Sequence, residues 1–154
     1  MAIKYVKCRA KHCLHMGEPI NKDEAVRDGK SYYHPDCYQV KEDIAEIIDL
    51  WVTRINKNSP YALLTRTINN IIYDKNIESG HLLYGIKYYI NHKIPLTYPA
   101  GMYYVIQNKK VEDEYYRFKL SQIPKQKTVS DDIETEADFT YTPTKKKGLE
   151  DIFK

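Results

Sequence analysis

Three cysteines and one histidine in the first quarter of the chain have the residue types and the spacing of a metal site. Cys8 and Cys13 are separated by four residues, and after a gap of twenty residues His34 and Cys37 follow with two residues between them. Structural zinc takes four ligands in a tetrahedron, and thiolate and imidazole are among its preferred donors. We therefore expect these four side chains to bind one Zn²⁺ ion.

The expected zinc is structural, because four protein ligands leave no coordination position open for water. A module of this length contains too little apolar surface to fold alone, and a bound metal would supply the missing stability. Two alternatives stay open. His12 or His15, which flank Cys13, could replace a ligand. The cysteines could instead be small buried hydrophobic residues, with His34 hydrogen-bonded at the surface.

The segment from Cys8 to Cys37, with its ending GKSYYHPDC, resembles the first zinc-binding half of a LIM domain and other treble-clef-like fingers. In LIM domains that half binds zinc through a Cys-x2-Cys…His-x2-Cys set, which maps onto Cys8, Cys13, His34 and Cys37. The first spacer here has four residues rather than two, and a second zinc-binding half is missing. The resemblance implies a structural Zn²⁺ ion.

The segment from Asp43 to Lys119 is similar to small proteins of bacteriophages and prophages of Gram-positive bacteria. Those proteins pair a cysteine knuckle with a helical segment like the one that runs from Tyr61 to Tyr89 here. This resemblance implies a phage-type accessory or regulatory protein in the cytoplasm of a bacterial host.

Short strands and turns are expected in the first 38 residues. The residues from Ile3 to Val6 suit a strand, and Gly17 and Pro19 indicate turns. The pair Asp28-Gly29 favours a tight hairpin between strands at 24–26 and 31–33.

Helical periodicity begins after Cys37. Apolar residues from Val40 to Ile55 recur at helical spacing and predict a helix of about eighteen residues that ends at 56–58. Ser59 and Ser79 are expected to cap two further helices, over 60–73 and 79–91. The segment 102–106 suits a strand or a buried helical turn. A short helix is expected over 111–120, with Val111, Tyr115 and Phe118 facing inward and Tyr116 as a further inward candidate.

The predicted fold is therefore α+β and mostly α, with a zinc finger of short β-hairpins at 1–38. A helical domain of three to five helices is expected at 39–122, and a flexible, disordered tail at 123–154. The tail contains a tract of acidic residues, and its composition is typical of disorder. It ends in Leu149, Ile152 and Phe153, a pattern similar to the peptides with which bacterial replication proteins dock on the sliding clamp. A plain disordered tail is the alternative.

The charge balance is compatible with nucleic-acid binding but does not indicate it, since the chain has 24 basic and 21 acidic residues. Lys4, Lys7, Arg9 and Lys11 form a basic group near the finger that could contact phosphates, and a solvated surface is the alternative. The start of the chain lacks the apolar core of a signal peptide, and three cysteines cannot form a complete disulfide set. We expect a reducing, cytoplasmic setting and no membrane partner.

Sequence motifs for catalysis are missing. The sequence contains no Gly-rich phosphate loop, nucleophile elbow or HExxH pattern, so we expect a protein that is not an enzyme and has no small-molecule substrate. A non-enzymatic factor that contacts DNA through the finger is the leading hypothesis. The alternative is a protein-interaction module that binds or inhibits a host replication or transcription component.

The helices over 60–73 and 79–91 also suggest a helix-turn-helix motif. In that arrangement the second helix would carry an exposed recognition face composed of His81, Tyr84, Lys87, Tyr88 and Asn91. Two helices packed in an ordinary bundle is the interpretation we favour, because the proposed recognition helix has few basic residues.

Overall fold

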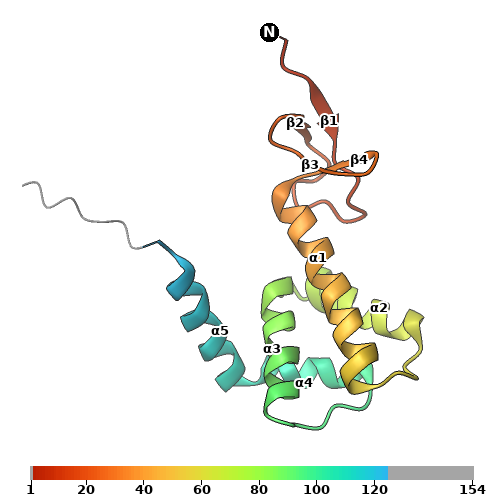
Figure 1. Cartoon of the computed structure of the whole chain (residues 1–154), viewed down its shortest axis with the longest axis vertical. Helices are drawn as coiled ribbons and strands as arrows, with labels where there is room; N and C mark the ends of the chain where they lie inside the picture. Colours follow the sequence, from red (N-terminus) through yellow and green to blue (C-terminus); the bar gives the residue numbers. More distant parts are fainter. Residues whose placement is uncertain (1, 125–154) are drawn as a thin grey trace, which may run out of the picture. The chain divides into compact units, whose positions relative to one another are not determined.

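Two short β-hairpins precede five α-helices in the computed structural model, which describes residues 2–124 (Figure 1). The fold is α+β and mainly helical, as the sequence predicted. Residues up to Ile123 form one compact unit. The expected tail, with Leu149, Ile152 and Phe153, lies outside the described residues apart from its first two. Within 2–124, none of the helices combines the length and the apolar composition needed to cross a bilayer.

The finger is built from two antiparallel strand pairs. Strand β1 (Tyr5–Lys7) pairs with β2 (Pro19–Asn21), and β3 (Val26–Asp28) pairs with β4 (Ser31–Tyr33). Gly29 has a φ of +59° in the turn between β3 and β4, a conformation that glycine adopts without strain. The prediction of a turn at Pro19 was wrong: Pro19 begins β2, an edge strand in which its missing N–H costs no ladder hydrogen bond.

Helix α1 (Pro35–Leu50) continues into a π-helical turn, η1 (Trp51–Ile55). Pro35 occupies the first helical position, where its fixed φ suits the helix and its missing N–H would have had no partner. The helix thus begins before Cys37, earlier than predicted, and ends at Asn56 as predicted. Its apolar stripe buries Ile47 and Trp51 completely.

The remaining helices complete the core. Helix α2 (Tyr61–Asn69) extends into the π-helical turn η2 (Asn70–Asp74), and α3 (Ser79–Asn91) follows. The 3-10 turn η3 (Pro99–Gly101) leads into α4 (Met102–Gln107), so the segment that could have been a strand is helical. Helix α5 (Lys109–Gln122) comes last. In Figure 1, α1 and α5 flank α3.

Close packing between α3 and α4 depends on Gly85. A Cβ atom at this position would lie 2.4 Å from Cγ1 of Val105, which is fully buried on α4. The missing side chain therefore allows α4 to approach α3. The main cluster of the core contains Ile47, Trp51, Leu64, Ile68, Ile71, Leu82, Ile86 and Met102.

The two serines predicted as helix caps do not cap. The Ser59 hydroxyl accepts a hydrogen bond from Nε1 of Trp51 at 2.8 Å, and Pro60 precedes the first residue of α2. The Ser79 hydroxyl donates to Oδ2 of Asp43 at 2.6 Å instead. Phe118 and the further inward candidate Tyr116 are 49% and 48% exposed, contrary to prediction, while Val111 and Tyr115 are buried as predicted.

Candidate metal centre

The four predicted ligands come from two segments, one between β1 and β2 and the other at the junction of β4 with α1. Cys8 directly follows β1 and forms a bridge to Tyr32 of β4, and the N–H of Arg9 donates to the carbonyl of Tyr32 at 2.9 Å. This pairing holds the first cysteine beside the end of β4. His34 follows β4, and Cys37 lies in the first turn of α1. Cys13 lies in the loop between β1 and β2.

The ligand atoms converge with the spacing of a tetrahedral site. The donor atoms of Cys8, Cys13, His34 and Cys37 all lie within 4.8 Å of one another. Cys13 Sγ lies 3.4 Å from Nδ1 of His34 and 3.9 Å from Sγ of Cys37, and Cys37 Sγ lies 3.9 Å from the same nitrogen. Zinc bonds of usual length imply edges of about 3.8 Å between sulfurs and about 3.6 Å between sulfur and nitrogen. The group could therefore hold one metal ion.

The pKa values of two cysteines in this cluster are shifted in opposite directions, upward for Cys37 and downward for Cys13. Burial raises the pKa of the Cys37 thiol to about 12, although the Leu14 N–H, 3.4 Å from its Sγ, opposes the shift. Burial alone would raise the pKa of the Cys13 thiol. Hydrogen bonds from the backbone of Gly17 and His15 and from the neighbouring thiols outweigh this effect, so the pKa of Cys13 is lowered. All three cysteines are free thiols rather than disulfides.

The two neighbouring histidines have other contacts. The His12 ring packs against Tyr73 of η2, with ring centroids 4.4 Å apart. His15 Nε2 lies 2.7 Å from Oδ2 of Asp36, and this interaction lowers the pKa of Asp36 against the opposing effect of burial. The donor atoms of His15, Asp36 and Cys37 form a second group within 4.8 Å. His15 thus lies beside the ligand Cys37, whereas the His12 ring packs on Tyr73.

The basic group predicted from the sequence lies on the surface of the finger. Lys4, Lys7, Arg9 and Lys11 are all exposed, and Tyr5 between them is 64% exposed. None of the four cations forms an ion pair with a residue in the part of the chain that the structure describes. The finger therefore presents four cations that no described carboxylate neutralises.

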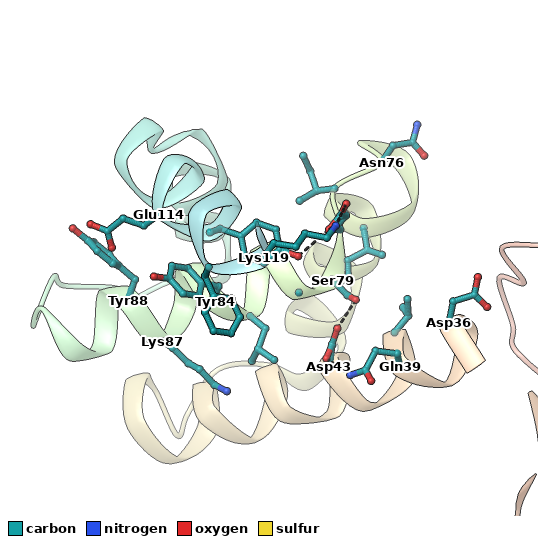
Figure 2. A pocket seen from close by; sticks show the side chains of 18 of the residues that line it. Asp36, Gln39, Asp43, Asn76, Ser79, Tyr84, Lys87, Tyr88, Glu114 and Lys119 are labelled. Carbon is teal, nitrogen blue, oxygen red and sulfur yellow. Dashed lines mark hydrogen bonds and ion pairs between the residues drawn. The ribbon is translucent and has the colours of Figure 1, made fainter. Parts of the chain in front are cut away.

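A second candidate site, which the sequence reasoning missed, is an open groove of about 990 Å³ lined by α1, α3 and α5. Figure 2 shows the hydrogen bond between Asp43 and Ser79, two of the residues that line it. Asp43 also accepts a hydrogen bond from Gln39 at 2.9 Å. Lys119 pairs with Glu78 at 2.6 Å. Only the packing of three distant segments creates this groove, so no local sequence pattern could reveal it.

Helix α5 packs on part of the face that the helix-turn-helix alternative would expose. The predicted recognition face of α3 is only partly exposed: His81 and Tyr88 are 5% and 7% exposed, whereas Lys87 and Asn91 are exposed and line the groove. The His81 ring stacks on Tyr115 of α5, with centroids 5.2 Å apart and an interplanar angle of 8°. Among the described residues its Nε2 atom is buried without a hydrogen-bond partner, and burial lowers the pKa of His81.

Comparisons with protein-family models, with curated proteins and with solved structures find no match to this chain. The LIM-like and phage-like resemblances therefore stay predictions.

Proposed function

We propose that the metal is Zn²⁺ and that its role is to fold the finger. Three soft thiolates and one imidazole favour zinc over magnesium or calcium, which prefer oxygen ligands. Four protein ligands complete a tetrahedron and leave no site for a substrate. His34, Cys8 and Cys37 are buried, so the ion would be shielded from solvent.

We further propose that this zinc-ordered finger is the nucleic-acid contact of a non-enzymatic, phage-type accessory or regulatory protein, with DNA as the favoured partner. The observation that supports this function is the exposed, unneutralised group of Lys4, Lys7, Arg9 and Lys11 on the finger. Cations that neutralise phosphates release counterions, which makes such binding tight at low salt. Tyr5, exposed among them, offers an aromatic face to an unpaired base.

Binding of labelled duplex and single-stranded DNA at low salt tests this proposal. Replacement of the four cations by alanine should abolish binding, and the wild-type affinity should fall steeply with salt. A matched control replaces four exposed lysines of the helical region: Lys57, Lys93, Lys109 and Lys110. Equal loss in the two variants would contradict a finger-directed contact, and undetectable wild-type binding would refute the function. Incubation of the purified protein with labelled DNA and Mg²⁺ should leave the DNA uncut.

A second candidate function is a protein-interaction module that binds or inhibits a replication or transcription component in the cytoplasm of a bacterial host. The groove between α1, α3 and α5 favours it, because a concave, largely apolar surface suits a protein ligand. Docking through Leu149, Ile152 and Phe153 is the other route. Affinity capture from a bacterial lysate distinguishes the groove route from the tail route. Phe118→Asp should abolish capture through the groove, and alanine at the three tail positions should abolish capture through the tail.

A further inference from the structure

Three helices present one face each to the groove. Helix α3 lines it along its whole length, through residues at the spacing of a single helical face: Gly80, Tyr84, Lys87 and Asn91. Helix α5 contributes Glu114 and Phe118, four residues apart, and α1 contributes Gln39 and Asp43, also four apart. Side chains at this spacing form ridges with grooves between them, and a further helix can pack its own ridges into those grooves.

The dimensions of the groove suit a helical occupant. Helix α3 has 13 residues, which corresponds to a length of about 20 Å at the usual helical rise. An occupant aligned with α3 would make three to four turns, about the average length of a helix in a globular protein. Val40, Leu83 and Phe118 supply apolar contacts from all three walls.

The charges of the groove favour a basic occupant. Its two lysines are already paired, Lys119 with Glu78 and Lys87 with Glu46. The carboxylate of Asp43 lies at the N-terminal end of α3, where the helix dipole favours negative charge. Glu114 forms no ion pair with a described residue, and Figure 2 shows it at the end of the groove near Tyr84 and Tyr88. A carboxylate beside aromatic rings is a suitable receptor for an ammonium or guanidinium group.

We propose that this groove binds an amphipathic α-helix of a partner protein, with an apolar stripe facing α3 and a lysine or arginine facing Glu114. The inference rests on the second candidate function and is independent of nucleic-acid binding by the finger. Helix-in-groove recognition uses apolar anchors at i, i+4 and i+7. The three walls provide the surface for those anchors, and Glu114 fixes the orientation of the bound helix.

Selection from a displayed library of 14-residue amphipathic helices, with the full chain as bait, tests the proposal. Binders should carry leucine, isoleucine or phenylalanine at i, i+4 and i+7 and a basic residue at one end. The synthesised consensus peptide should bind one to one. Phe118→Ala should weaken it at least tenfold and Glu114→Gln severalfold. Leu120→Ala is the matched control, because Leu120 is 67% exposed on the same helix and does not line the groove.

Three results would overturn the proposal. The first is a selection that yields no binder dependent on Phe118. The second is a consensus without basic residues whose affinity is unchanged by Glu114→Gln. The third is a dimer in sedimentation velocity that Phe118→Ala dissociates, since the groove would then be covered by a second copy of the chain. If the selection fails while lysate capture still depends on the tail, the helix proposal is wrong and the interaction function survives.

Discussion

The carboxylate of Asp43, in the middle of α1, accepts a 2.6 Å hydrogen bond from the hydroxyl of Ser79, the first residue of α3. Both residues are buried, at 7% and 6% exposure. This contact joins the helix that begins in the finger to the central helix of the core, at the base of the groove.

Asp43→Ala should therefore destabilise the protein. The change leaves the buried hydroxyl of Ser79 without its acceptor, at an expected cost of about 1–3 kcal/mol in the free energy of unfolding. Asp49→Ala, at an exposed position of the same helix, should change stability by less than about 0.5 kcal/mol. Urea unfolding of both variants measures the difference, and equal effects would show that the Asp43–Ser79 contact has no energetic importance.

Gly85→Ala should also destabilise the protein, because the new methyl group would overlap Val105. Overpacking of this kind costs about 1–3 kcal/mol. The double variant Gly85→Ala, Val105→Ala should be more stable than the sum of its single variants predicts, since the second change removes the overlap. Gly101→Ala is the control: its Cβ would meet only the flexible end of Leu96, at 3.0 Å. Thermal unfolding of the four variants checks this, and simple additivity would contradict it.

The buried ring of His81 should make stability depend on pH. Burial lowers the pKa of His81 in the folded state, while Glu112 and Glu78 partly oppose that effect. The unfolded chain then binds more protons just below pH 6.5, so the free energy of unfolding rises with pH through this window and falls on acidification.

His81→Phe should keep the stack on Tyr115 and remove the orphaned nitrogen. The free energy of unfolding of the variant should be higher by about 1 kcal/mol at pH 7. It should also depend less on pH, because the contribution of His81 is removed. Guanidinium unfolding between pH 5.5 and 7.5, with excess zinc, measures both quantities. An unchanged slope in the variant would mean that another group causes the pH dependence.

Removal of the metal should unfold the finger and spare the helical core. The hairpins bury little apolar surface, whereas the core contains ten buried side chains in its main cluster. Chelation should therefore abolish protection from amide exchange in β1 to β4, while α3 and α4 stay protected. Global unfolding after chelation would contradict this division.

Much of the architecture could be predicted from local pattern. The apolar periodicity from Val40 to Ile55 predicted the long helix, and Asp28-Gly29 predicted a hairpin. Its first strand runs from Val26 to Asp28 rather than over 24–26, so the turn itself consists of Gly29 and Lys30. The spacing of the cysteines and His34 predicted a cluster that the structure brings together.

The errors at the two predicted helix caps arose because another residue binds each serine side chain. Ser59 and Ser79 have the residue type of helix caps, but Trp51 and Asp43 bind their hydroxyls. The helix-turn-helix alternative, which the sequence disfavoured, placed His81 and Tyr88 on an exposed face, because nothing in the sequence of α3 indicates that α5 packs on His81. The groove has the same origin, since its walls come from three helices far apart in the chain.

The most direct test of the central claim is the metal content of the purified chain, measured by native mass spectrometry together with zinc X-ray absorption. We predict one zinc per chain with three sulfur ligands and one nitrogen ligand. Cys13→Ser and His34→Ala should lose the metal, whereas His12→Ala and His15→Ala should retain it. A chain that carries no metal, or a zinc whose nitrogen ligand disappears in His15→Ala, would contradict the assignment of Cys8, Cys13, His34 and Cys37 as the ligands.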